Sequence, residues 1–185
     1  ATSGIGDRVG VYAPSVVKDG NTYKMWYTGE DGSSIPRIYL ATSFDGLTWS
    51  KVDNRVPVRD DSTAGRIALG ANVAGIGDKN MVADPSVIKD GNTYKMWYAG
   101  HDGSNWRIYY ATSSDGLTWH KVNNNIPDNS NTISYGGRIP LGVTGSGDDS
   151  HVRAPIVIKD MDFYRMWYSG YDGSSWRIYY ATSVD

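Results

Sequence analysis

The chain has 185 residues, no cysteine and a formal net charge of −2, with 14 Tyr and 7 Trp against 2 Phe. This length suits one domain with a sizeable core. The lack of cysteine excludes disulfides and thiolate metal sites, and the near-neutral charge argues against binding to nucleic acid or an anionic membrane. There is no apolar stretch of about 18 residues, so the sequence predicts no membrane-spanning helix.

Almost the whole chain consists of a repeated unit. The triplet Ala-Thr-Ser returns at 41–43, 111–113 and 181–183, a spacing of 70 residues, and 17 of the 21 residues in 14–34 match those in 85–105. A fixed period is the signature of a repeat architecture. We divide this single repeat domain into blade units 4–74, 75–144 and 145–185, or about 2.6 repeats.

Each unit is expected to form an antiparallel meander. Turn signals such as Asp19-Gly20 and Asp45-Gly46 separate short segments that are rich in β-branched and aromatic residues. No segment shows a sustained 3.6-residue apolar period, so no helix is expected. The recurring stretches 65–70 and 137–142 are expected to add a short strand or to pack on a face. In the first unit the expected strands are 15–18, 22–28, 37–43 and 48–52, and the third unit ends before its fourth.

The second strand of each unit predicts how the sheets stack. Residues 23–27, Tyr-Lys-Met-Trp-Tyr, place large side chains on both faces of a strand. A sheet with one wet face alternates apolar and polar residues, whereas a sheet between two like sheets is buried on both faces. We therefore predict an all-β fold, a β-propeller of four-stranded antiparallel blades. A β-sandwich is the alternative, but it does not account for the period.

The number of units does not close a ring, because propellers have about four to eight blades. Open blade faces would expose aromatic surface, which monomers rarely tolerate. Either the chain is a piece of a longer one, or copies assemble with one another, a two-fold dimer being favoured. The aromatic residues expected on these open faces are Tyr23, Trp26, Tyr164 and Trp167.

The second unit carries three segments with a family resemblance: DPSVIKDG at 84–91, YKMWYAG at 94–100 and RIYYATSSDGLTW at 107–119. These resemble the five-bladed β-propeller glycoside hydrolases, the arabinanase, β-xylosidase and invertase-like group with its uncharacterised repeat-rich relatives. The resemblance implies an oligo- or polysaccharide ligand, no cofactor, and a secreted or extracytoplasmic location. It also implies carboxylates on the innermost strands, one a base or nucleophile and one an acid.

Asp84 is the candidate catalytic carboxylate. It precedes a proline at the start of its blade, where the other units have Ala13 and Ala154, so it breaks the repeat. The structural alternative is a solvated loop carboxylate or a cap. A matching acid is missing, because the single glutamate, Glu30, is expected in the turn after the second strand.

Positions 30, 101 and 171 vary within an otherwise constant turn, which indicates exposed tips that can contact ligand or simply drift. The candidate ligand-binding residues are Glu30, His101, Tyr171, Trp106 and Trp176. The three histidines lack metal-ligand spacing, so no metal site is predicted. The aspartates and arginines that recur in every unit are interpreted as turn caps or Asp–Arg pairs.

Three functions remain open. The first is a glycosidase-like module that lacks full catalytic activity, self-assembles and binds carbohydrate. The second is a catalytic glycoside hydrolase fragment that uses Asp84. The third is a duplicated or engineered structural repeat with no ligand. Near-identity between repeats and the missing acid favour little hydrolysis by this chain, since an active site needs one blade to differ from the next.

Overall fold

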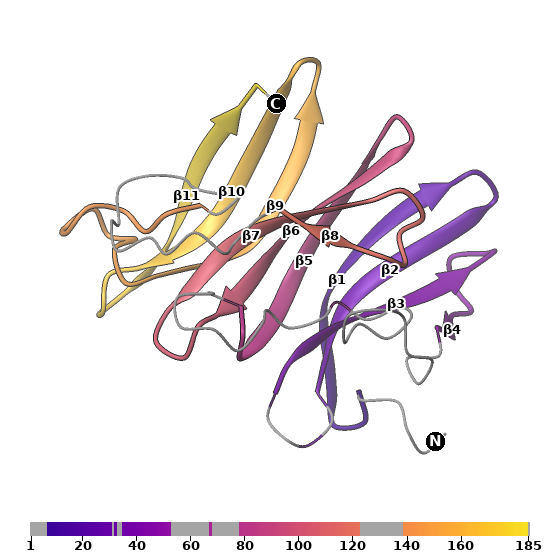
Figure 1. Ribbon diagram of the computed structural model, residues 1–185, viewed down its shortest axis with the longest axis horizontal. Coiled ribbons are helices and arrows are strands. Elements are labelled where there is room, and N and C mark those ends of the chain that lie inside the picture. The colour runs from indigo at the N-terminus through magenta and orange to yellow at the C-terminus, as the bar shows by residue number, and fades with distance from the viewer. Residues whose placement is uncertain are drawn as a thin grey trace.

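The chain forms three antiparallel sheets that stand side by side (Figure 1). The computed structural model describes residues 7–30, 32, 35–52, 67, 78–122 and 139–184. In these residues the first blade comprises β1 (Gly10–Asp19), β2 (Thr22–Glu30), β3 (Arg37–Ser43) and β4 (Ser50–Lys51). The second comprises β5 (Met81–Asp90), β6 (Thr93–His101), β7 (Trp106–Ser113) and β8 (His120–Lys121). The third comprises β9 (His151–Asp160), β10 (Phe163–Tyr171) and β11 (Trp176–Ser183).

The prediction of an all-β propeller with a three-stranded last blade is confirmed, and the described residues contain no helix. The first strand of each blade is longer than expected and the fourth is shorter. The predicted limits of the units fall largely outside the described residues and stay a prediction. In the stretch 65–70 only Ile67 is described. It donates its N–H to the carbonyl of Ile38, and Ile139 does the same to Ile108 in the next blade.

The hairpin turns follow from local backbone chemistry. Gly20 and Gly91 have φ of +57° and +59°, in the left-handed region that glycine adopts at little cost. Met161 holds the same place in the third blade with φ 54°, a conformation that strains a side chain. At the turns before β4 and β8, Asp45 and Asp115 each accept backbone N–H groups through Oδ1, which confirms their interpretation as turn caps.

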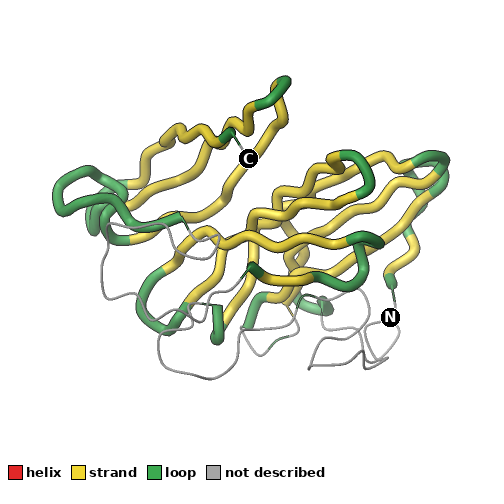
Figure 2. The backbone as a smooth tube through the Cα atoms, turned by 45° about the horizontal axis from the view of Figure 1, so that its top comes forward, coloured by secondary structure: helices red, strands yellow, loops and turns green. Residues whose placement is uncertain are grey.

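The first strands lie together at the axis. Strand β5 contacts β1 on one side and β9 on the other (Figure 1). Figure 2 shows the described part of the chain as strands joined by turns and loops. A serine of each strand joins it to the next: Ser15 Oγ accepts the Val87 N–H, and Ser86 Oγ accepts the Val157 N–H, both at 2.9 Å. Blade order around the axis therefore follows chain order.

Each sheet has two different faces. The Met-Tyr face carries Met25, Tyr27, Tyr39 and Ala41 in the first blade, with their equivalents in the others. The Trp-Ile face carries Trp26, Ile38 and Leu40 with their equivalents. The Trp-Ile face of each blade packs on the Met-Tyr face of the next, and these two junctions hold the largest hydrophobic clusters. Burial of both faces explains why the second strand lacks apolar–polar alternation.

The expected list of exposed aromatic residues is wrong for two members. Trp26 and Tyr164 are buried, because the Trp-Ile face of the first blade and the Met-Tyr face of the third point into the junctions. Trp167, on the Trp-Ile face of the third blade, is 38% exposed. Side-chain alternation decides which face a residue lies on, and the presence of a neighbouring blade decides whether that copy is buried.

A recurring aspartate ties each blade together from the Met-Tyr face. Asp7 accepts the Tyr27 hydroxyl at 2.6 Å and pairs with Lys51 at 2.6 Å. The second blade repeats both contacts and the third repeats the tyrosine contact: the residues are Asp78, Tyr98, Lys121, Asp148 and Tyr168. The predicted Asp–Arg pairs are present elsewhere, at Asp102–Arg107 and Asp172–Arg177, where each aspartate also caps its turn.

Candidate functional site

Asp84 lies on β5, the axial strand of the middle blade, between β1 and β9. It is 6% exposed, and its backbone N–H is donated to Thr28 Oγ1 at 2.9 Å. Asp84, Ala13 and Ala154 have φ of 53°, 50° and 51°, next to a register shift in each strand pair. Aspartate tolerates this left-handed conformation better than alanine. On β5 this register shift accompanies the contact of Asp84 with Arg153 on the neighbouring axial strand β9.

Arg153 of β9 is the ionic partner of Asp84. Its Nε and Nη2 each lie 2.8 Å from Asp84 Oδ2. The guanidinium also lies over the ring of Trp106, 4.8 Å from the centroid. Two donors on one oxygen and a ring beneath the cation restrain both charges. The second and third blades thus share one fixed ion pair at the axis.

Tyr12 and Glu30 of the first blade lie near the Asp84–Arg153 ion pair. The Tyr12 hydroxyl donates to Glu30 Oε1 at 2.9 Å. Burial, this hydrogen bond and the negative charges of Glu30 and Asp84 raise the pKa of Tyr12 to about 12, against an opposing effect of Arg153. The phenol is therefore within electrostatic reach of both carboxylates and of the guanidinium. We call Tyr12, Glu30, Asp84 and Arg153 the axial cluster.

Aromatic side chains continue from the axial cluster across the second and third blades. His101 packs on Trp106, with ring centroids 5.0 Å apart. His151 accepts the Trp106 backbone N–H and stacks on Tyr171, which stacks on Trp176. Burial lowers the pKa of both histidines, and the charge of His101 lowers that of His151 further. The neutral imidazoles and the packed rings form a largely apolar surface next to the axial cluster.

The placement of Glu30, His101 and Tyr171 differs from the expectation of loop tips. They are the last residues of β2, β6 and β10, and all are half-buried. Glu30 pairs in register with Gly10 of the axial strand β1, so it lies beside an inner strand after all. Because the last residue of β2 pairs with the first residue of β1, Glu30 lies at the axis. The spacing of residues in the sequence does not show where a strand ends relative to its partner.

Three residues of this site were missed in the sequence: Tyr12, Arg153 and His151. A signal for them exists. Tyr12, Ala83 and Arg153 occupy one repeat position, and His151 shares another with Gly10 and Met81. Like Asp84, these positions break the repeat, and all of them lie near the start of an axial strand. Residues that differ between the otherwise near-identical units therefore gather where the axial strands begin.

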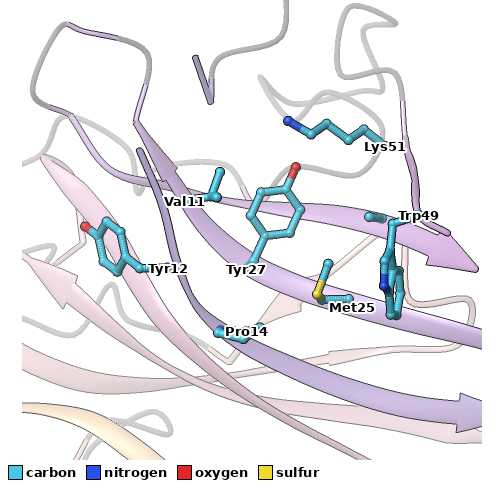
Figure 3. A pocket seen from close by; sticks show the side chains of 8 residues that line it. Val11, Tyr12, Pro14, Met25, Tyr27, Trp49 and Lys51 are labelled. Atoms are coloured by element: carbon cyan, nitrogen blue, oxygen red, sulfur yellow. The ribbon is translucent and has the colours of Figure 1, made fainter. Parts of the chain in front are cut away.

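A separate pocket of about 250 Å³ opens on the Met-Tyr face of the first blade (Figure 3). It is lined mainly by apolar side chains, and Tyr12 of the axial cluster is one of the lining residues. Figure 3 shows Met25, Tyr27 and Trp49 rising from the sheet, with Lys51 beside them. The lining residues are Val11, Tyr12, Pro14, Met25, Tyr27, Ala41, Trp49 and Lys51.

Comparison with known proteins gives a fold and no assigned activity. No protein-family model matches the chain. Uncharacterised proteins from two strains of Mycobacterium tuberculosis are 32% identical to it over 193 residues, which cover 98% of this chain and 54% of theirs. The chain thus spans about half the length of the curated relatives it matches.

Among solved structures, the family 117 glycoside hydrolase Zg3597 of Zobellia galactanivorans superposes with a TM-score of 0.72 and 17% identity, over 100% of this chain and 55% of that one. This chain has the fold of the β-propeller glycoside hydrolases. A thermostable family 43 glycoside hydrolase gives a TM-score of 0.60 at 19% identity, over 95% and 51% of the two chains. A β-1,2-mannobiose phosphorylase of Listeria innocua gives 0.59 at 13%, over 95% and 40%.

These neighbours confirm the resemblance inferred from residues 84–119 at the level of the fold. The described residues hold no group of three or more His, Cys, Asp or Glu side chains that could bind a metal ion. They also hold no helix long and apolar enough to cross a bilayer. The roles of Asp84 and of the five ligand-binding candidates stay predictions.

Proposed function

We propose that this chain is a glycosidase-like propeller module that binds an oligosaccharide at the axial cluster. The observation that carries the proposal is the meeting of Tyr12, Glu30, Asp84 and Arg153 from three blades, at positions where the repeats differ. Carboxylates accept hydrogen bonds from sugar hydroxyls, and a guanidinium donates to them. The adjoining rings offer a flat apolar surface of the kind that contacts a pyranose or furanose face.

Binding is favoured over turnover because of how the carboxylates are held. Hydrolysis needs one carboxyl group as acid and a second as base or nucleophile. Asp84 accepts two bonds from Arg153, and Glu30 accepts one from Tyr12, so both are arranged as acceptors. Neither is set up to donate a proton, and loss of general acid catalysis forfeits about 10²–10⁴-fold in rate.

The proposal is tested by calorimetric titration with arabino-, xylo- and fructo-oligosaccharides. Arg153→Met should weaken binding about 10- to 100-fold, because a charged hydrogen-bond donor is lost while the packing of the side chain is kept. The matched control is Lys89→Met, which removes a cation paired with Asp19 about 17 Å further along the axial strands. Equal losses in both variants, or no binding by the unaltered chain, would contradict the proposal.

A second candidate function, hydrolysis with Asp84 as the base, is favoured by the proximity of two carboxylates to Tyr12. Release of reducing sugar from the same oligosaccharides distinguishes the two functions. We expect little or no release. Robust release that Asp84→Asn abolishes would establish catalysis and replace the binding-only proposal.

A further inference from the structure

The junction between the second and third blades contains a hydrogen bond that the junction before it cannot form. Trp106, the first residue of β7, donates its backbone N–H across the junction to His151 Nδ1 at 3.2 Å. In the first unit the residue before Arg37 is Pro36, which has no N–H, and the second unit has Met81 in place of His151. The donor and its acceptor are thus both present at one junction and both absent at the other.

This hydrogen bond fixes the form of the His151 side chain. Its Nδ1 accepts a hydrogen bond and so carries no proton, which places the proton of the neutral ring on Nε2. A protonated imidazole donates from both nitrogens and cannot accept the Trp106 N–H. Acidification therefore replaces an acceptor with a donor at this contact.

The surroundings of His151 favour its neutral form. Burial lowers the pKa of His151 most, the positive charges nearby lower it further, and only a carboxylate opposes them. The charged and titratable groups that face it from the packed elements are His101 of β6, Asp102 of the turn after β6, Arg107 of β7, Arg153 of β9 and Tyr171 of β10. The folded chain therefore holds His151 neutral until the solution is more acidic than an ordinary histidine requires.

Trp106 connects His151 to the axial cluster. The Arg153 guanidinium lies over the Trp106 ring, 4.8 Å from its centroid, and Arg153 donates to Asp84 through Nε and Nη2. Because Trp106 makes both contacts, a change at its N–H displaces the ring beneath the cation. Asn105 Nδ2 also donates to the Ser150 carbonyl at 2.8 Å, and this contact does not titrate, so we expect a shift of Trp106 and no separation of the blades.

We propose that His151 is a positioning residue of the axial cluster: its neutral ring holds Trp106 beneath Arg153, and its protonation releases Trp106. The consequence for ligand binding rests on the proposed function, in which Arg153 donates to a sugar hydroxyl. Protonation of His151 should then weaken oligosaccharide binding about 3- to 10-fold, the effect of one hydrogen bond. The site thus binds its ligand at neutral pH and releases it on acidification.

Nuclear magnetic resonance of the sugar-free chain tests the positioning without a ligand. At about pH 8 a nitrogen–proton correlation spectrum should show His151 in the Nε2–H form. During titration to about pH 5, the Trp106 amide and the Arg153 Nε–H should shift together with His151. The midpoint should lie below the ordinary histidine value of 6.5. An Nδ1–H form, or a Trp106 amide that does not follow His151, would overturn the inference whatever the sugar does.

The matched variant for this titration is His151→Asn. Its amide oxygen lies as many bonds from Cβ as Nδ1 does, accepts the Trp106 N–H and does not titrate. The acid-induced shifts of Trp106 and Arg153 should therefore disappear.

Calorimetric titration with arabino-, xylo- and fructo-oligosaccharides at about pH 8 and about pH 5 tests the effect on binding. His151→Asn should bind equally at both, and His151→Met, with the residue of the second unit, should bind weakly at both. The controls His101→Tyr, with the residue of the third unit, and His120→Asn, on the exposed start of β8, should keep the pH dependence.

Full pH dependence in His151→Asn, or its loss in His101→Tyr, would overturn the inference. If no oligosaccharide binds while Trp106 follows His151 in the sugar-free chain, the proposed function fails and the positioning by His151 stands.

Discussion

Trp26 and Trp167 occupy the same position of the repeat in two different environments, so they form a matched pair for a stability test. Trp26 is 1% exposed, and its Nε1 donates to the Gly116 carbonyl at 3.0 Å. Its ring also packs against Tyr94 and Trp119. Trp167 is 38% exposed and packs against Tyr180 of its own sheet. We expect Trp26→Ala to destabilise the chain far more than Trp167→Ala.

The difference in cost follows from the two exposures, 38% against 1%. A tryptophan side chain has about 250 Å² to bury, so the second blade covers about 90 Å² more of Trp26. At about 25 cal/mol per Å², this area contributes about 2 kcal/mol. The lost hydrogen bond to Gly116 adds about 1 kcal/mol, because a buried carbonyl is left without its donor. Trp26→Ala should therefore cost about 3 kcal/mol more than Trp167→Ala.

Urea unfolding followed by circular dichroism measures both costs. The free energies of unfolding are compared at equal slope with urea, so that a change in midpoint reports stability. If the two variants differ by less than about 1 kcal/mol, the second blade does not cover Trp26 in solution. The described order of blade packing would then be wrong.

Three further outcomes are expected. Gly100→Ala should destabilise the chain by about 1–3 kcal/mol or more in thermal unfolding, because its Cβ would lie 2.4 Å from Asp78 Cβ; no change would mean that this contact is absent. Met161→Gly should stabilise it by up to about 1 kcal/mol, since φ 54° suits glycine as at Gly20, and a loss of stability would contradict the strained turn. The pKa of Tyr12 is about 12 in the folded chain and about 10 in the unfolded chain. The neutral phenol therefore stabilises the folded chain fully below about pH 10, and this stabilisation is lost as the pH rises through about 12. An ultraviolet difference titration against Tyr12→Phe should show ionisation of Tyr12 near about pH 12, and ionisation near about pH 10 would refute the raised pKa.

The repeat in the sequence determined the strands, their turns and the propeller fold. Identical segments at a fixed spacing must form identical units, and glycine after aspartate at residues 20 and 91 sets hairpins wherever it recurs. The break in the repeat at Asp84 also singled out a residue that lies on an axial strand. Local chemistry was sufficient for these conclusions because neighbours in sequence form the contacts that decide them.

Only the tertiary structure brought Asp84 to Arg153 and placed Tyr12 and Glu30 beside them, since these groups come from three sheets whose residues lie about one repeat apart. It also decided which copy of a repeated residue is buried. Trp26 and Trp167 occupy the same strand position, yet among the described residues only Trp26 of the two has a following blade against its face. Burial depends on the neighbour in space, and a repeated segment carries no record of whether that neighbour is present.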